Sequence, residues 1–167
     1  MGLEQHRREG AGRYGFAIVT VSDTRDRSTD RGGAFLVSAV EEADHRVEAR
    51  LIVKDDRDEI LAALGQTTGQ EEVDAVLFTG GTGLGPRDVT APTLEGAFES
   101  HIPGFGELFR SLSYEQIGSA TILSGATAGV LRGRIVFALP GSPKALGLAM
   151  EKIVLPEIGH LVSQVRG

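Results

Sequence analysis

The 167-residue chain has no cysteine and no long apolar run. The absence of cysteine excludes disulfides, thiolate zinc sites, iron–sulfur clusters and a cysteine nucleophile. No window reaches the roughly 18 continuous apolar residues of a membrane helix, and charges stand near the N-terminus where a secretory signal needs an apolar run. We therefore expect a cytoplasmic protein with no membrane partner, in which residues 1–13 form a flexible N-terminus.

Basic charge is also scarce. Lysine and arginine number 17 against 23 acidic residues, which gives a formal net charge of −6, and no basic run follows the short N-terminal segment. We therefore expect no nucleic-acid partner. An acidic protein that binds an anion must hold it through local backbone donors, cations or a metal, because its overall field repels the ligand.

The motifs of several common enzyme classes are missing too. The sequence has no GxSxG nucleophile elbow, and no HExxH or paired spacing links the histidines, which are His6, His45, His101 and His160. We therefore expect neither a histidine metal site nor a site built on a nucleophile elbow.

Short β-branched runs alternate with helical patterns along the chain. Helical spacing of apolar residues occurs in three segments, of which Pro156 should kink or divide the last, and a further helical stretch lies within 96–119. This alternation predicts a three-layer α/β sandwich with a mostly parallel sheet. No repeat or linker divides the chain, so we expect one domain over residues 14–167. The predicted strands are 15–21, 47–53, 73–79, 119–123 and 134–139, and the three helical segments are 32–44, 57–67 and 145–162.

Small, hydroxylated or acidic residues follow every predicted strand. In open α/β sheets, ligands bind beyond the carboxyl ends of the strands, so these residues are candidates for a site. Loops favour such residues in any protein, so one loop alone is weak evidence for a site, whereas all five together are stronger evidence. The candidates are Ser22 and Asp23 after the first strand, Asp55 and Asp56 after the second, 80–90 after the third, Ser124 after the fourth and 140–145 after the fifth.

The loop after the third strand is rich in glycine. Glycines allow positive φ and let successive backbone N–H groups point into one concavity, which can hold a phosphate. The loop fails both common phosphate motifs, since Pro86 and Arg87 replace the lysine and hydroxyl of a Walker loop and Pro86 replaces the third glycine of GxGxxG. A tight strand-to-helix turn is the alternative explanation. The candidate residues are Gly80, Gly81, Thr82 and Gly83.

Carboxylates flank this loop. Asp55 and Asp88 come from separate loops, and two such groups beside a phosphate-binding loop suit a Mg²⁺ ion that bridges substrate phosphates. This arrangement is typical of phosphoryl or nucleotidyl transfer. Helix capping is an alternative role for Asp56 and Asp88, and Thr90 is another candidate cap for a helix that begins near Pro92.

The loop after the fifth strand forms a second candidate anion site. Ser142, the backbone N–H groups of the following helix and the Lys144 ammonium would bind the anion together. A solvated surface lysine is the alternative for Lys144. The candidate residues here are Pro140, Gly141, Ser142 and Lys144.

Taken together, these motifs resemble the MogA/MoaB group of molybdenum-cofactor biosynthesis proteins. The resemblance extends from about Phe16 to the C-terminus, and the combination is far more specific than any one motif. The segments that carry it are "TVSDT" (20–24), "IVKDD" (52–56), "TGGTGLGPRDVT" (79–90), "PGFGELFR" (103–110), "LSGATAGV" (123–130) and "LPGSPKAL" (139–146).

The resemblance implies a molybdopterin-binding (MogA-like) fold. For active members it implies that molybdopterin and ATP react, with Mg²⁺, to adenylylated molybdopterin and pyrophosphate. Asp55 and Asp88 match the functional carboxylates, and Asp55 is the expected Mg²⁺ ligand. We expect a trimer or hexamer and a molybdenum-insertion protein as a partner. The expected substrate-binding residues are Ser22, Asp23, Gly80, Gly81, Thr82, Gly83, Ser124, Pro140, Gly141, Ser142 and Lys144.

Gly125 departs from the family pattern, which has arginine after the serine of "LSRA". The absence of this arginine removes an expected anion contact. The segment 104–124 is closer to MoaB-type members, whereas "GPRDVT" is closer to the active type. A MoaB-type carrier that binds molybdopterin without chemistry is therefore the alternative function, and an unrelated nucleotide-binding regulator is a third.

Overall fold

The first strand, β1 (Gly15–Val21), is buried along its whole length in the computed structural model, which describes residues 12–167. Its side chains alternate between two cores. Phe16 and Ile18 pack into the core on one face of the sheet, and Val19 and Val21 pack into the core on the other. This burial on both faces is typical of a strand inside a parallel sheet covered by helices on each side.

The sheet has six strands in the order β2-β1-β3-β6-β5-β4. β1 pairs in parallel with β2 and β3, and β3 pairs in parallel with β6. β5 is antiparallel to both of its neighbours, so it alone runs in the opposite direction. The remaining strands are β2 (Arg46–Val53), β3 (Ala75–Thr79), β4 (Ser100–His101), β5 (Thr127–Leu131) and β6 (Arg134–Leu139).

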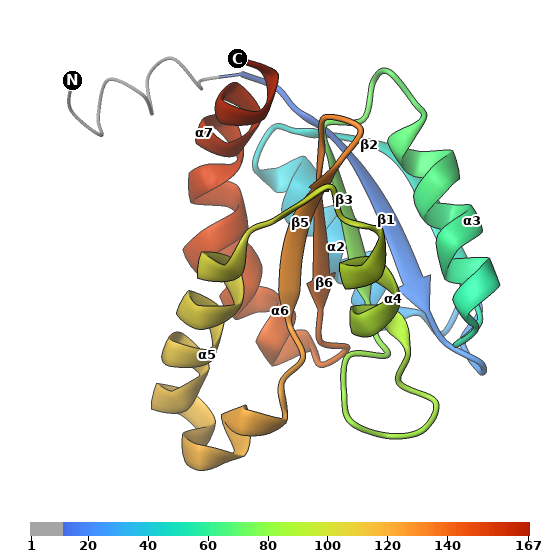
Figure 1. Ribbon diagram of the computed structural model, residues 1–167, viewed down its shortest axis with the longest axis vertical. Helices are drawn as coiled ribbons and strands as arrows, with labels where there is room; N and C mark the ends of the chain where they lie inside the picture. Colours follow the sequence, from blue (N-terminus) through green and yellow to red (C-terminus); the bar gives the residue numbers. More distant parts are fainter. Residues whose placement is uncertain (1–11) are drawn as a thin grey trace.

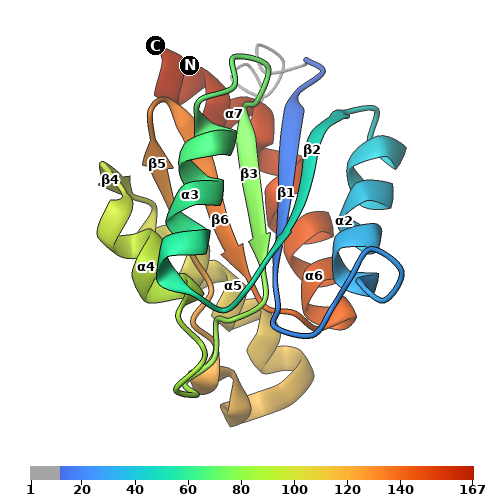
Figure 2. The same cartoon turned by 90° about the vertical axis from the view of Figure 1, so that its right-hand side faces the viewer.

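Helices cover both faces of this sheet (Figures 1 and 2). Figure 2 shows α3 and α4 in front of the sheet, with α6 and α7 behind it. The three-layer sandwich with a mostly parallel sheet is therefore confirmed. The helices are α2 (Arg31–Glu42), α5 (Pro103–Ile117), α6 (Pro143–Ala149) and α7 (Leu155–Arg166) on one face, and α3 (Arg57–Thr68) and α4 (Thr90–Ala97) on the other.

The fourth predicted strand, 119–123, is wrong. This segment belongs to a 3₁₀ helix, η1 (Gly118–Leu123), that follows α5 after Gly118 adopts φ 61°. The strand is instead β5, which forms a hairpin with β6 through Arg132 and Gly133, at φ 51° and 70°. Two central residues at positive φ match the twist of paired strands, and this local signal identifies the hairpin better than the apolar content of 119–123 does.

The long C-terminal helical pattern is divided, as predicted from Pro156. A π-helical turn, η2 (Met150–Val154), separates α6 from α7, and Pro156 lies in the first turn of α7. Proline has no N–H to donate, so the widened turn adjusts the helix just before the site of the missing bond. Of the predicted flexible segment 1–13, residues 1–11 lie outside the described part of the chain.

His45 fixes the start of β1 and gives a testable pH dependence. The Tyr14 N–H donates to Nδ1 of His45 at 3.2 Å, and the imidazole packs against the Tyr14 and Phe16 rings. Burial lowers the pKa of His45. A lowered pKa means that the unfolded chain binds the proton more readily, so stability is complete above the unfolded-state pKa of about 6.5 and decreases as the pH falls below it.

We expect the free energy of unfolding to decrease between pH 7.5 and 5.5 more steeply in the wild type than in His45→Gln, which does not titrate there. Urea unfolding at several pH values measures both slopes. Equal slopes would show that His45 does not contribute to the pH dependence.

Candidate functional site

The polar loops meet at one edge of the sheet because the parallel strands β2, β1, β3 and β6 all end there. Hydrogen bonds connect neighbouring loops. The Gly80 N–H donates to the Leu139 carbonyl at 3.1 Å, and the Thr79 hydroxyl donates to the Pro140 carbonyl at 3.1 Å. Ser124 reaches the same edge because β5 runs in the opposite direction and therefore begins where the others end. Its place was predicted correctly, although the strand assigned before it was wrong.

A cavity of about 440 Å³ lies at this edge, within the size range of small-molecule sites. One wall consists of backbone and small polar groups from the strand-end loops, and the other comes from α5 and η1 and is largely apolar. The first wall contains Gly80, Gly81, Thr82, Gly83, Asp88, Ser124, Pro140, Gly141 and Ser142, and the second contains Phe109, Ser113, Ile117, Ala120, Thr121 and Leu123.

Four predicted site residues lie beside this cavity and do not line it. Ser22 borders a neighbouring cavity of about 70 Å³ that shares Gly80 and Gly141 with the larger one. Lys144 is exposed and borders another cavity of about 70 Å³, which shares Ser113 and Ser142. Asp23 and Asp55 line none of these three cavities, although Asp55 lies beside Gly81 and its N–H donates to Asp23.

The glycine loop requires glycine at its first two positions. Gly80 and Gly81 have φ values of 96° and 67°, where L side chains are strained. A Cβ on Gly80 would approach the Val21 carbonyl oxygen, and one on Gly81 would approach the Thr90 hydroxyl, both inside 3.0 Å. The cavity wall at Gly80 and Gly81 therefore consists of backbone, whose N–H groups can bind an anion.

Asp55 forms no ion pair among residues 12–167, whereas its neighbour Asp23 pairs with Arg87 at 2.6 Å. The Asp55 N–H donates to Asp23 Oδ1 at 3.2 Å. The pKa of Asp55 is raised, first by burial and then by the negative charge of Asp23, with a smaller contribution from Asp88. The Asp23 backbone N–H and the Arg87 charge act in the opposite direction and offset part of this rise. A carboxylate with a raised pKa close to a cavity is a candidate functional group.

Asp88 is not a helix cap. Val89 holds the N-cap position of α4 and makes no side-chain cap bond. The Asp88 carboxylate turns back onto its own loop, where Oδ2 accepts the Gly85 N–H at 2.9 Å, and it lines the cavity. Asp56 does cap α3, accepting two backbone N–H groups at 3.0 Å. The capping alternative is thus wrong for Asp88 and right for Asp56.

Thr90 is not a cap either, since it is the first residue of α4. It is fully buried, and its hydroxyl has no hydrogen-bond partner in the described chain. An unsatisfied buried hydroxyl costs roughly 1–3 kcal/mol. We expect Thr90→Val to raise the free energy of unfolding by about 1 kcal/mol, because valine keeps the shape and removes the uncompensated group.

Thr67→Val is the matched control for this prediction. Thr67 is equally buried, but its hydroxyl donates to the Ala63 carbonyl at 2.8 Å, so valine there removes a bond. Denaturant unfolding should separate the two variants. A Thr90→Val protein no more stable than Thr67→Val would contradict the expectation.

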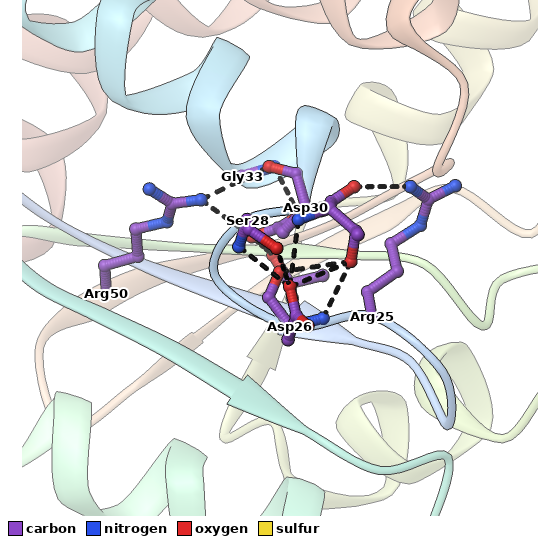
Figure 3. Close-up of polar contacts among 8 residues, drawn as sticks. Arg25, Asp26, Ser28, Asp30, Gly33 and Arg50 are labelled. Atoms are coloured by element: carbon purple, nitrogen blue, oxygen red, sulfur yellow. Dashed lines mark hydrogen bonds and ion pairs between the residues drawn. The ribbon is translucent and has the colours of Figure 1, made fainter.

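A buried carboxylate that sequence reasoning missed fixes the loop 22–30. Asp30 accepts hydrogen bonds from the Thr20 hydroxyl at 2.9 Å and the Gly33 N–H at 2.9 Å, and it pairs with Arg50 at 3.1 Å. Figure 3 shows Asp30 with Gly33 and Arg50. An aspartate directly before a helical pattern is an N-cap signal, so Asp30 could have been found from the sequence.

The backbone at Thr82 leaves no room for a side chain at Gly125. The Gly125 N–H donates to the Thr82 carbonyl at 3.1 Å, and a Cβ would approach that carbonyl inside 3.0 Å. A guanidinium still reaches this loop, since Arg110 Nη1 donates to the carbonyls of Ser124 and Ala126 at 3.3 and 2.9 Å. Arg110 thus holds the loop from the side of a separate cavity of about 250 Å³.

The apolar wall is the part of the site that sequence reasoning missed. Phe109, Ser113 and Ile117 recur every four residues, a spacing that places them on one face of a helix. That spacing was a usable signal, but the sequence does not say whether such a face meets a core or a cavity. Across residues 12–167 no helix is long and apolar enough to cross a membrane, and no group of three or more histidine or acidic side chains is placed to hold a metal.

Fold and site first define a class, namely α/β proteins that bind a ligand in a backbone-lined cavity at the carboxyl edge of a parallel sheet. A sequence model of the probable molybdopterin binding domain matches residues 17–160. Molybdenum cofactor biosynthesis protein B of Bacillus subtilis (strain 168) is 44% identical over 167 residues, covering 99% of this chain and 98% of the relative.

Solved structures agree with this match. A crystal structure of molybdenum cofactor biosynthesis protein B is 44% identical, with a TM-score of 0.90 over 93% of this chain and 97% of that one. The tungsten cofactor synthesizing protein MoaB from Pyrococcus furiosus is 34% identical, with a TM-score of 0.84 over 93% and 98% of the two chains. The chain therefore belongs to the MogA/MoaB family of molybdenum-cofactor biosynthesis proteins.

Proposed function

We propose that this protein adenylylates molybdopterin with Mg-ATP and releases pyrophosphate. The observation that carries the proposal is the Asp55 carboxylate, which has a raised pKa, forms no ion pair among residues 12–167 and lies beside a loop that has no room for side chains at Gly80 and Gly81. A carboxylate of raised pKa next to a loop of backbone donors suits a substrate that brings both phosphates and a cation.

The reaction needs no general base. An oxygen of the terminal phosphate of molybdopterin attacks the α-phosphorus of ATP, a P–O bond forms, and the bond to the leaving pyrophosphate breaks. The attacking oxygen is already anionic near pH 7, so the protein has to position the two phosphates and neutralise their charge. A cavity lined by no histidine is compatible with this chemistry.

The residues of the site would share this work. The backbone of Gly80–Gly83 would bind the phosphates, Thr82 would orient the pterin side, and Asp88 would position the substrate. Asp55 would hold Mg²⁺, which withdraws charge from the phosphates when bound. The donors fit this ion, because Mg²⁺ takes hard oxygen ligands and is held by one or two carboxylates plus substrate phosphates, without a cage of three protein groups.

A pyrophosphate assay tests the proposal. Purified protein supplied with molybdopterin and Mg-ATP should release pyrophosphate in proportion to the pterin added, and omission of pterin should abolish the release. Tight molybdopterin binding without pyrophosphate would overturn the enzyme and support a MoaB-type carrier. ATP binding that is indifferent to pterin would support a nucleotide-binding regulator.

We also propose that the protein works in the cytoplasm as a trimer or hexamer and passes its product to a molybdenum-insertion protein, as the family resemblance implies. Exposed large apolar side chains support an assembly. Apart from Phe35 on α2, they lie on α5, η1 and the glycine loop, and include Leu84, Leu108, Tyr114, Ile117 and Ile122. Light scattering coupled to size exclusion would give the mass in solution, and a monomer would refute the assembly.

A further inference from the structure

Ser113 is the one polar residue on the α5 face that lines the 440 Å³ cavity. Phe109 precedes it by one turn and Ile117 follows it by one turn, so the three side chains form a row along the cavity. Phe109 is buried against the core, whereas Ile117 is exposed at the rim. Ser113 therefore interrupts an otherwise apolar surface at its centre.

The Ser113 side chain has no hydrogen-bond partner in the described part of the chain. The residue is only 6% exposed, and among residues 12–167 nothing forms a hydrogen bond with its hydroxyl. Buried helical hydroxyls usually donate to a carbonyl one turn back, as Thr67 and Thr68 do in α3 at 2.8 and 2.7 Å. Ser113 does not use that bond, which leaves a donor and an acceptor for a group in the cavity.

The surroundings indicate the chemistry of that group. Across the cavity lie the glycine loop and Ser142, whose hydroxyl oxygen already accepts the Ala145 N–H at 3.2 Å. That wall suits phosphate. The opposite wall offers apolar contact around the Ser113 hydroxyl, since its other hydroxyl, on Thr121, already donates to the Arg110 carbonyl at 3.4 Å. A flat nitrogen heterocycle has this character, with apolar faces and a polar edge.

We propose that Ser113 is a specificity-determining residue whose hydroxyl hydrogen-bonds to the polar edge of the ligand's heterocycle, while Phe109 and Ile117 contact its face. The inference rests on the proposed function, which supplies two heterocycles of this chemistry, the pterin of molybdopterin and the adenine of ATP.

Binding measurements on three variants test the inference. Neopterin, followed by its fluorescence, and AMP, followed by calorimetry, serve as the probes, with pyrophosphate as a ligand that lacks a heterocycle. Ser113→Ala should weaken binding of one heterocycle about tenfold, the value of one hydrogen bond, and leave pyrophosphate affinity unchanged. Ser113→Thr keeps the hydroxyl and should restore most of the affinity. Ser111→Ala, at an exposed position of the same helix, is the control.

The outcomes separate the two proposals. Selective loss of neopterin or of AMP identifies the heterocycle that contacts Ser113. Wild-type protein that binds both probes while Ser113→Ala binds them equally well overturns the inference alone. Wild-type protein that binds neither probe overturns both the inference and the proposed substrates. A thermal melt of Ser113→Ala that matches the wild type shows that any loss comes from the contact and not from unfolding.

Discussion

Replacing Asp55 with asparagine is expected to lower the turnover number for pyrophosphate release by about two to three orders of magnitude, the usual effect of removing a transition-state charge contact. Neopterin affinity should change little, because Asp55 does not line the cavity wall formed by α5. Asparagine keeps the shape of the side chain but cannot supply the negative charge that a Mg²⁺ ion needs.

The same variant should be at least as stable as the wild type. Burial and Asp23 raise the pKa of Asp55, so the folded protein holds its proton more tightly than the unfolded chain does. That contribution to stability is present at low pH and is lost as the pH rises through the folded pKa. At neutral pH the ionised carboxylate is thus a net cost, which asparagine removes. Unchanged or increased Tm together with lost turnover would be the signature of a functional group.

Asp56 provides the matched control, because it is adjacent in sequence and serves a different purpose. Asp56→Ala removes the N-cap of α3 and should cost about 1 kcal/mol of stability without lowering turnover. Turnover follows from a continuous pyrophosphate assay, and stability from thermal melts of the same samples. If Asp55→Asn retains full turnover, the proposed role of this carboxylate is wrong.

Local signals predicted the parts of the site that are made by local structure. The positive φ values of Gly80 and Gly81 follow from glycine's lack of a side chain, and the strand-end position of Asp55 follows from the alternation of strands and helices. These features needed no knowledge of tertiary packing. The sequence was therefore sufficient to predict the sandwich, the edge of the sheet at which the polar loops meet and the backbone at the glycine loop.

The features that sequence reasoning missed depend on long-range contacts. Residues 119–123 have strand-like composition, but Gly118 ends α5 and the hairpin partner of β6 lies further along the chain. The face of α5 that carries Ser113 is apolar enough to be core, and only the position of η1 leaves a cavity beside it. Lys144 was placed in the site by its neighbours in sequence, yet it borders only an adjoining cavity.

Gly125→Arg, which restores the residue usual in the family, is expected to impair this protein. The Cβ of arginine would approach the Thr82 carbonyl oxygen inside 3.0 Å, and that carbonyl already accepts the Gly125 N–H. Overpacking of this kind costs roughly 1–3 kcal/mol. Because Thr82 lines the cavity, its displacement should also weaken ligand binding and lower turnover.

Two further variants show whether the steric clash or the added charge causes the effect of Gly125→Arg. Gly125→Ala adds the clash without the charge and should lose a similar amount of stability. Gly96→Ala, on α4 with nothing within 4 Å of the added Cβ, should instead gain up to about 1 kcal/mol from helix propensity. Denaturant unfolding and the pyrophosphate assay are applied to all three. If Gly125→Arg is as stable as the wild type and turns over faster, the loop moves at little cost and the arginine was a missing anion contact. If Gly125→Arg and Gly125→Ala are both impaired, the close approach of Thr82 requires glycine at this position. Arg110 then supplies the guanidinium contact to this loop instead of an arginine at position 125.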